Sequence, residues 1–149
     1  MAKNHFKRGE LYSVLNAMAA TAIARRLQKN FRNNGIEITI EQWSILYHLW
    51  KQDGLNQQDL CNKTFRDKPS ITRLIDNLEK QKLVKRVSDK KDKRVNSVCL
   101  TDAAKQLQEI TINIANQTMD EALVNVSKEE IETVKNVLQK VYDNLTTQQ

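Results

Sequence analysis

The sequence predicts a mainly α-helical fold with one small antiparallel β-hairpin, an α+β protein. Its 149 residues include only three glycines and one proline. Such a composition favours long helices with short connections over a β-sandwich or a glycine-rich nucleotide loop. Apolar residues recur at helical spacing along most of the chain, whereas residues 83–100 alternate as two short strands around a charged tip. The length fits a single domain.

The first predicted helix spans residues 10–33 and carries apolar residues on two neighbouring faces. One face holds Leu11, Leu15, Met18 and Ala22, and the other holds Ile23, Leu27 and Phe31. Two apolar faces indicate contact with two surfaces, the core and a second subunit. Asn33-Asn34-Gly35 ends this helix.

A second helix begins after Thr39, which forms a capping-box pattern with Gln42. It is the most aromatic stretch of the chain and includes Trp43, Tyr47 and Trp50. Aromatic residues at helical spacing usually pack in a core. The alternative is that part of this face lines a small-molecule pocket against the first helix.

Two further helices follow, a short one and a longer one, and a tight turn separates them. Asn56 and Asp59 predict the start of the short helix, NQQDLCNKT. Residues 65–67 form the turn, which lacks the glycine often found there. Asp67 can cap the longer helix, and Pro69 fits its first turn. This arrangement predicts a helix-turn-helix.

The longer helix, residues 68–80, has an apolar stripe and a polar face. Ile71, Leu74, Ile75 and Leu78 form the stripe. Ser70, Arg73 and Asn77 lie opposite, with Thr72 beside them. Short polar side chains and one arginine suit the edges of DNA bases. An ordinary solvated helix face is the competing interpretation.

A charged β-hairpin comes next. Residues 83–87 form its first strand, SDKKDKR its tip, and Val95 to Leu100 its second strand. A charge run alone usually marks a solvated loop. Directly after a helix-turn-helix, however, the hairpin predicts a winged helix-turn-helix.

Two helices complete the chain. Thr101 caps one that we expect to reach Val126, and Ser127 with Glu130 opens the last. In the last helix the apolar residues repeat at spacings of three and four: Ile131, Val134, Leu138, Val141 and Leu145. This seam packs either against a second subunit or against the preceding helix of the same chain.

The positive charge of the chain is concentrated in the helix-turn-helix and the hairpin. Residues 63–94 hold 12 Lys and Arg against 5 Asp and Glu, a net charge of +7, whereas residues 95–149 hold 4 against 8, a net charge of −4. This asymmetry indicates a polyanionic partner.

Enzymatic and metal-binding functions find no support in the sequence. There is no paired-carboxylate, nucleophile–base or phosphate-loop pattern, and neither His5 and His48 nor Cys61 and Cys99 are spaced as metal ligands. We therefore predict no enzyme, cofactor or metal site. No apolar run is long enough to span a membrane and no signal-peptide core is present, so we expect a cytoplasmic protein with reduced cysteines.

Two segments resemble the multiple antibiotic resistance regulator (MarR) family. DKRVNSVCLT, residues 92–101, is similar to its wing signature, and ITRLIDNLEKQKLVKR, residues 71–86, to its recognition helix and first wing strand. Lys82 stands where the family often has glycine, so we expect a left-handed backbone there. The peroxide-sensing cysteine of one branch has no counterpart.

The resemblance implies a homodimeric repressor on a pseudo-palindromic double-stranded operator, released by a small lipophilic or aromatic ligand. The expected arrangement is one domain over residues 1–149. Its dimerisation helices lie at about 8–34 and 102–147, and its DNA-binding lobe at about 38–101. The expected dimer contacts are Leu11, Leu15, Ile131, Val134, Leu138, Val141 and Leu145. An activator, or a partner-binding module without ligand control, is the alternative.

The residues themselves and this resemblance give the candidate sites. Arg73 is the main candidate for a base contact, followed by Ser70, Thr72 and Asn77, while Arg66 and Lys68 suit phosphates. In the wing, Arg94 suits the minor groove, Lys90, Lys91 and Lys93 add general attraction, and Asp92 supports Arg94 or a nearby basic group. The candidate ligand-binding residues are Tyr12, Met18, Arg25, Trp43, Tyr47 and Trp50, and Arg26 is an alternative partner for an anionic ligand.

Overall fold

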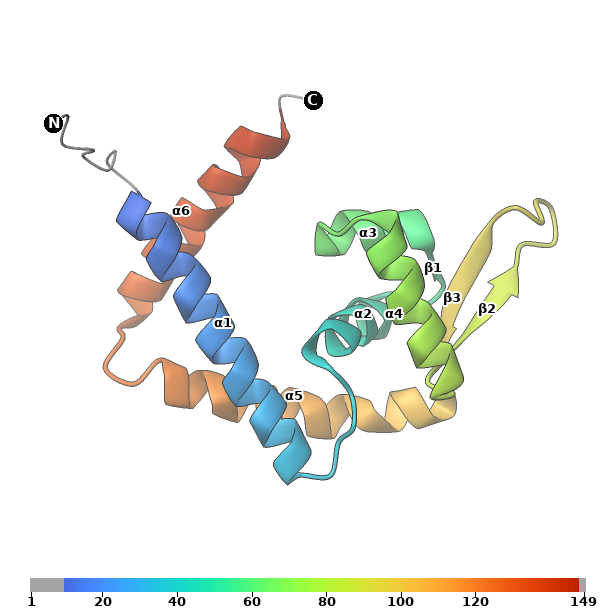
Figure 1. Cartoon of the computed structure of the whole chain (residues 1–149), viewed down its shortest axis with the longest axis horizontal. Helices are drawn as coiled ribbons and strands as arrows, with labels where there is room; N and C mark the ends of the chain where they lie inside the picture. Colours follow the sequence, from blue (N-terminus) through green and yellow to red (C-terminus); the bar gives the residue numbers. More distant parts are fainter. Residues whose placement is uncertain (1–9, 148–149) are drawn as a thin grey trace, which may run out of the picture. The chain divides into compact units, whose positions relative to one another are not determined.

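The computed structural model describes residues 10–147 and confirms the mainly helical fold with a small sheet (Figure 1). Its elements are α1 (Glu10–Asn33), α2 (Ile40–Lys51), β1 (Leu55–Asn56), α3 (Gln57–Thr64), α4 (Lys68–Lys80), β2 (Val84–Ser88), β3 (Asn96–Leu100), α5 (Asp102–Ala122) and α6 (Lys128–Thr146). The chain forms two compact units that divide within α5, one up to Thr118 and one from Met119.

The helix starts that the sequence predicts are confirmed. Thr39, Asn56 and Ser127 each accept a hydrogen bond from the main chain three residues later and belong to complete capping boxes. Asp67 caps α4 through the main-chain N–H of Ser70, at 2.8 Å. These caps satisfy donors that the helix itself leaves unpaired, which fixes where each helix begins.

The sheet has three antiparallel strands in the order β1-β3-β2. In the hairpin Arg86 lies opposite Val98, and in the short β1, which the sequence did not predict, Leu55 pairs with Val98. Asp53 fastens the other end of β3, because its carboxylate accepts the main-chain N–H of Leu100 at 2.8 Å. The hairpin is thereby joined to the turn before α3.

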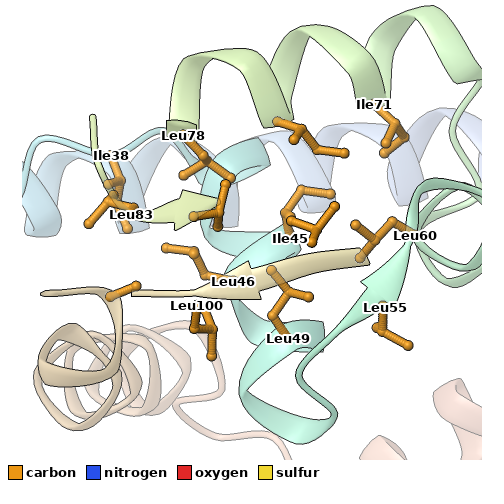
Figure 2. Close-up of a cluster of buried hydrophobic side chains, with 14 of the residues drawn as sticks. Ile38, Ile45, Leu46, Leu49, Leu55, Leu60, Ile71, Leu78, Leu83 and Leu100 are labelled. Carbon is orange, nitrogen blue, oxygen red and sulfur yellow. The ribbon is translucent and has the colours of Figure 1, made fainter. Parts of the chain in front are cut away.

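The hydrophobic core lies beneath α4, where α2, α3 and the sheet meet it (Figure 2). Ile71 and Leu78 point from α4 toward Ile45 of α2, and Leu60 of α3 closes one side. All four side chains are fully buried. Burying each is worth about 1.5–3 kcal/mol relative to exposure, so the apolar stripe holds α4 with its polar face outward.

The two apolar faces of α1 have different environments. Leu27 and Phe31 are buried in the core, as expected. Leu15 and Met18 are 54% and 63% exposed, and the side chain of Leu11 lies outside the described residues. Asn30 donates to the hydroxyl of Thr118 on α5 at 2.8 Å. The C-terminal half of α1 is therefore a core element, and its N-terminal half leaves an apolar stripe uncovered.

The unit from Met119 onward contains the end of α5 and all of α6. The prediction that α5 reaches Val126 was wrong, because α5 ends at Ala122 and Asn125 takes a left-handed φ of 62°. The seam residues of α6 are largely uncovered: Val134 is 55% and Leu145 74% exposed. No helix among residues 10–147 is both long and apolar enough to cross a membrane.

Candidate nucleic-acid interface

Helix α4 is fixed at both ends by main-chain hydrogen bonds. Asp67 caps its start, and hydrogen bonds from Ser70 lower the pKa of Asp67, with smaller contributions from Arg73 and Arg66. At the other end Lys82 N–H donates to Glu79 O and Leu83 N–H to Leu78 O, both at 2.9 Å. This pair of bonds is a Schellman motif. Lys82 occupies its left-handed position at φ 59°, as the sequence predicted.

The outward face of α4 lines a groove of about 310 Å³. Four of the predicted DNA-binding residues lie along it at spacings of three or four: Arg66, Ser70, Arg73 and Asn77. The N-terminal turn of α2 forms the opposite wall, with Thr39, Glu41 and Gln42. The structure therefore brings together a row of polar and cationic side chains that begins in the turn at Arg66 and continues along a well-anchored helix.

The arginines of this region differ in whether their guanidinium is bound to carboxylates of the same chain. Arg73 is exposed and takes part in no ion pair among residues 10–147. Arg86 instead reaches from β2 to α4, where its Nη2 lies 2.6 Å from Asp76 Oδ1 and its Nη1 lies 2.5 Å from Glu79 Oε2. Its guanidinium thus joins the wing strand to the second half of α4.

Electrostatics keeps this junction charged. Burial lowers the pKa of Arg86, but the hydrogen bonds and charges of Asp76 and Glu79 outweigh it and raise the pKa above its usual value. The sequence analysis missed this role. Side chains alternate between the two faces of a strand, so Arg86 lies on the same face as the buried Val84. This alternation could have indicated that Arg86 faces the protein and not solvent.

The hydroxyl of Thr72 is less available for contact with DNA than the polar side chains of its neighbours on α4. Its hydroxyl donates to the carbonyl oxygen of Lys68 at 2.9 Å and accepts a hydrogen bond from Gln57 Nε2 on α3. A hydroxyl has one proton, so Thr72 has none left for a base. Its contact with Gln57 instead fastens α3 to α4. The side chain retains a methyl group and one lone pair for DNA.

The hairpin tip is shaped by two aspartates that bind main-chain groups. Asp89 Oδ1 accepts from Lys91 N–H at 2.7 Å, and Asp92 Oδ1 accepts from Arg94 N–H at 3.0 Å. Asp92 therefore contacts the backbone of Arg94, whereas the sequence predicts a charge-assisted bond to Arg94 or a nearby basic group. Around them four cationic side chains are exposed: Lys90, Lys91, Lys93 and Arg94.

A second recess, of about 290 Å³, separates the hairpin from α3 and the start of α4. Lys68, Arg86 and Arg94 line it, together with side-chain amides such as Asn56 and Asn96. Lys68 and Arg94, predicted on separate elements, thus border one cationic depression. The surface that includes the groove along α4, this recess and the hairpin tip is called the reading head below.

The predicted ligand-binding residues do not form one site. Trp43 and Tyr47 are neighbours, with ring centroids 5.6 Å apart, and Phe31 packs edge-on against Trp43 at 6.0 Å. Trp50 is directed elsewhere, since its indole N–H donates to Ala104 O on α5 at 3.0 Å. Among residues 10–147, the indole N–H of Trp43 is buried without a hydrogen-bond partner.

The remaining ligand candidates lie on α1, and two of them, Tyr12 and Met18, are far along the helix from Phe31. Tyr12, Met18 and Arg25 are exposed. Met18 precedes Phe31 by 13 residues. At about 1.5 Å per residue it lies roughly 20 Å away along the helix, and Tyr12 lies farther still. Within one protomer, α1 therefore contributes Phe31 to the aromatic cluster rather than Tyr12 or Met18.

The left-handed Lys82 leads to a first prediction. Lys82→Gly is expected to stabilise the protein by about 1 kcal/mol, because a side chain in the left-handed region is strained and glycine is not. The melting temperature should rise by about 2–4 °C in a thermal-unfolding experiment. Lys80→Gly, inside α4, is the matched control and should lower the stability by about 1 kcal/mol. A fall in the melting temperature of Lys82→Gly would contradict the strain argument.

Comparisons with known proteins agree with this geometry. The model of the MarR family matches residues 38–95. The chain is 32% identical over 106 residues to the HTH-type transcriptional regulator YdgJ of Bacillus subtilis, a match that covers 71% of this chain and 63% of YdgJ, so it spans less than two thirds of that relative.

Solved structures match over nearly their whole length. The S. aureus MepR–DNA complex has a TM-score of 0.80 and 30% identity, covering 89% of this chain and 97% of that one. Bordetella bronchiseptica BpsR, studied for regulation of its DNA binding by 6-hydroxynicotinic acid, has a TM-score of 0.80 over 90% of this chain and 100% of that one. At 22% identity it shows the fold alone. The family-model match, the likeness to MepR and the winged helix-turn-helix geometry together show that the chain belongs to the MarR family.

Proposed function

We propose that this protein is a sequence-specific, double-stranded DNA-binding transcriptional regulator that acts as a homodimeric repressor and is released by a small ligand. The observation that carries the proposal is the row of Ser70, Arg73 and Asn77 on a helix fixed at both ends, which Arg66 continues in the turn just before the helix. The net charge of +7 over residues 63–94 supports it. MepR, which resembles the chain along its length, was solved in complex with DNA.

In this proposal α4 enters the major groove and Arg73 makes the principal base contact. Its exposed guanidinium is unpaired within the described residues and can donate two parallel hydrogen bonds to O6 and N7 of guanine. Ser70 and Asn77 flank it on the same row. Thr72, whose proton is engaged, is left with a methyl contact or a weak acceptor role.

Phosphate contacts come from both ends of the reading head. Arg66 and Lys68 lie where α4 begins, and backbone contacts of this kind set the register of a protein on DNA without reading sequence. The exposed tip places Lys90, Lys91, Lys93 and Arg94 beyond the sheet. Arg94 is our candidate for a narrow A·T-rich minor groove, which attracts arginine electrostatically.

Dimerisation accounts for two apolar surfaces that one protomer leaves open. On α1, Leu15 and Met18 are more than half exposed, and so are Val134 and Leu145 on α6. A second copy of the chain would cover both stripes and present two reading heads to half-sites about 34–36 Å apart.

Ligand control rests on the aromatic cluster of Trp43, Tyr47 and Phe31. The indole N–H of Trp43, which is buried and has no partner among the described residues, can donate a hydrogen bond to a ligand oxygen. Because BpsR shares the fold, 6-hydroxynicotinic acid is a suitable first compound, and salicylate is a second small aromatic acid to compare with it. We expect one of them to quench Trp fluorescence and to dissociate bound DNA. Unchanged fluorescence and unchanged DNA binding over a millimolar range would remove this part of the proposal.

The central test is selection of DNA by the wild-type protein from a random-sequence library. The duplex that the protein enriches is called the selected duplex. We expect it to contain two related half-sites and to bind with a steep salt dependence. Each phosphate contact contributes about −0.9 to the slope of log K against log salt, so a dimer using half of its candidate cations gives roughly −5. No enrichment, or binding independent of salt, would favour a partner-binding module instead.

A further inference from the structure

The wall that faces α4 across the groove carries a carboxylate. Among the described residues that line the groove, Glu41 of α2 is the single acidic one, whereas Arg66 and Arg73 are cationic. The side chain of Glu41 is exposed and takes part in no ion pair among residues 10–147. The groove, one of the two hollows of a surface that we propose for a polyanion, therefore contains a negative charge.

The main chain that leads into this wall is held from two sides. Gln28 of α1 donates through Nε2 to Ile38 O at 2.9 Å, and its Oε1 accepts from Ile40 N–H at 3.1 Å. Gln81, which caps the end of α4, donates through Nε2 to Glu37 O at 3.3 Å. These three hydrogen bonds fix the start of α2 relative to α1 and α4, so the first turn of α2 keeps its carboxylate at the groove.

Helix stability offers one explanation for this carboxylate, since an acidic residue in the first turn stabilises a helix through its dipole. The other polar groups of the wall belong to the capping box. Thr39 Oγ1 accepts from Gln42 N–H at 3.1 Å, and Gln42 Oε1 accepts from Thr39 N–H at 2.9 Å. Stability and DNA binding are separate measurements, so a role of Glu41 in the helix can be distinguished from a role at the groove.

The recess beside the hairpin, the second hollow of the reading head, has a different charge. Lys68, Arg86 and Arg94 line it, and none of its described lining residues is acidic. A phosphate that enters the recess meets cations alone, whereas a phosphate that enters the groove also approaches Glu41. Like charges brought together across an interface weaken the complexes that require them. The recess therefore accepts a phosphate more readily than the groove does.

We propose that Glu41 is a specificity-determining residue of the reading head, because its carboxylate opposes the entry of a phosphate into the groove where Arg73 lies. This inference rests on the proposed function. On random DNA the cations of a protein bind phosphates, and a guanidinium can do so through two parallel hydrogen bonds. A phosphate that reached Arg73 in this way would approach Glu41, whereas the edge of a guanine carries no net charge. Glu41 therefore weakens binding to random DNA more than binding to the selected duplex.

The test replaces Glu41 by glutamine, which has nearly the same shape and no charge. Glu41→Gln should bind random DNA about three- to tenfold more tightly, and the selected duplex less than about twofold more tightly. On random DNA the slope of log K against log salt should become steeper by up to about 0.9, the contribution of one further phosphate contact. The melting temperature should fall by about 1–3 °C, because the first turn of α2 loses a favourable charge. Competition binding over a salt series and thermal unfolding measure these changes.

Glu37→Gln is the matched control, because it removes the same charge from the loop just before α2. Glu37 is exposed and is not among the residues that line the groove. Its replacement should change the affinity for both DNAs by the same factor, less than about two, as expected for a charge screened by salt. Glu41→Asp keeps the charge at the groove and should discriminate between the two DNAs as the wild type does.

The ratio of the two affinities decides the outcome. If Glu41→Gln binds both DNAs more tightly by the same factor, or binds both like the wild type, the carboxylate does not exclude phosphates from the groove and the inference is overturned. If Glu41→Gln enriches a different base in the half-sites, Glu41 reads a base, which overturns the inference as well. Failure of the wild-type protein to enrich any duplex would instead overturn the proposed function itself.

Discussion

Replacing Arg73 by alanine is expected to reduce the discrimination between the selected duplex and random DNA by about 1–3 kcal/mol, or roughly 5- to 150-fold. The guanidinium is exposed, lies midway along the groove and is in no ion pair among the described residues. It therefore has its full set of donors for a guanine edge. Competition binding with both DNAs at one salt concentration measures the effect.

Lys91→Ala provides the comparison for Arg73→Ala. Lys91 is exposed at the hairpin tip and contacts no base in the proposed complex. Its loss should weaken binding to both DNAs equally and reduce the salt slope by about 1. Equal losses on both DNAs for Arg73→Ala would mean that Arg73 contacts only phosphate, and base reading would then have to come from Ser70 and Asn77.

Introducing two aspartates into the α6 seam is expected to separate the proposed dimer and reduce affinity for the selected duplex more than about 100-fold. Val134 and Val141 are 55% and 39% exposed in the protomer, so Val134→Asp with Val141→Asp should not disturb its own fold. In an apolar interface the same carboxylates would be buried without partners. Sedimentation gives the mass of the particle, and circular dichroism reports its helices.

Asn136→Asp is the control for the seam, because it adds a negative charge to α6 off the seam, one of the two that the double variant adds. It should leave the protein dimeric. If the double variant loses helix instead of dissociating, the seam packs within its own chain. If it stays dimeric and bound to DNA, other surfaces join the subunits.

Local features of the fold could be predicted because their causes are close together in the sequence. A cap such as Thr39 acts on Gln42, three residues away, and the stripe from Ile71 to Leu78 needs only the helical repeat. The expected strain at Lys82 also follows from its place at a helix end. The end of α5 was misjudged because the apolar pattern continues through Val124 and Val126, although the chain turns there at Asn125.

Long-range contacts of the candidate site could not be predicted in the same way. The bond from Leu100 N–H to Asp53 spans 47 residues. The junction of Arg86 with Asp76 and Glu79 depends on how β2 lies against α4, which no local pattern specifies. In the sequence Arg86 is one of several arginines in a basic stretch. Only the structure separates it, as a residue bound to carboxylates, from the available Arg73.

The Arg86 junction also constrains the architecture of the DNA sites. Because one guanidinium holds both β2 and the second half of α4, we expect the helix and this strand to keep their relative orientation on DNA. In the proposed complex, α4 reads bases and the hairpin tip touches DNA at the side of those bases. One protomer fixes the number of base pairs between these two contacts. The number of base pairs between the two half-sites depends instead on how the dimer spaces its two reading heads. Among natural binding sites, we therefore expect this central spacer to vary in length and each half-site to keep a constant length.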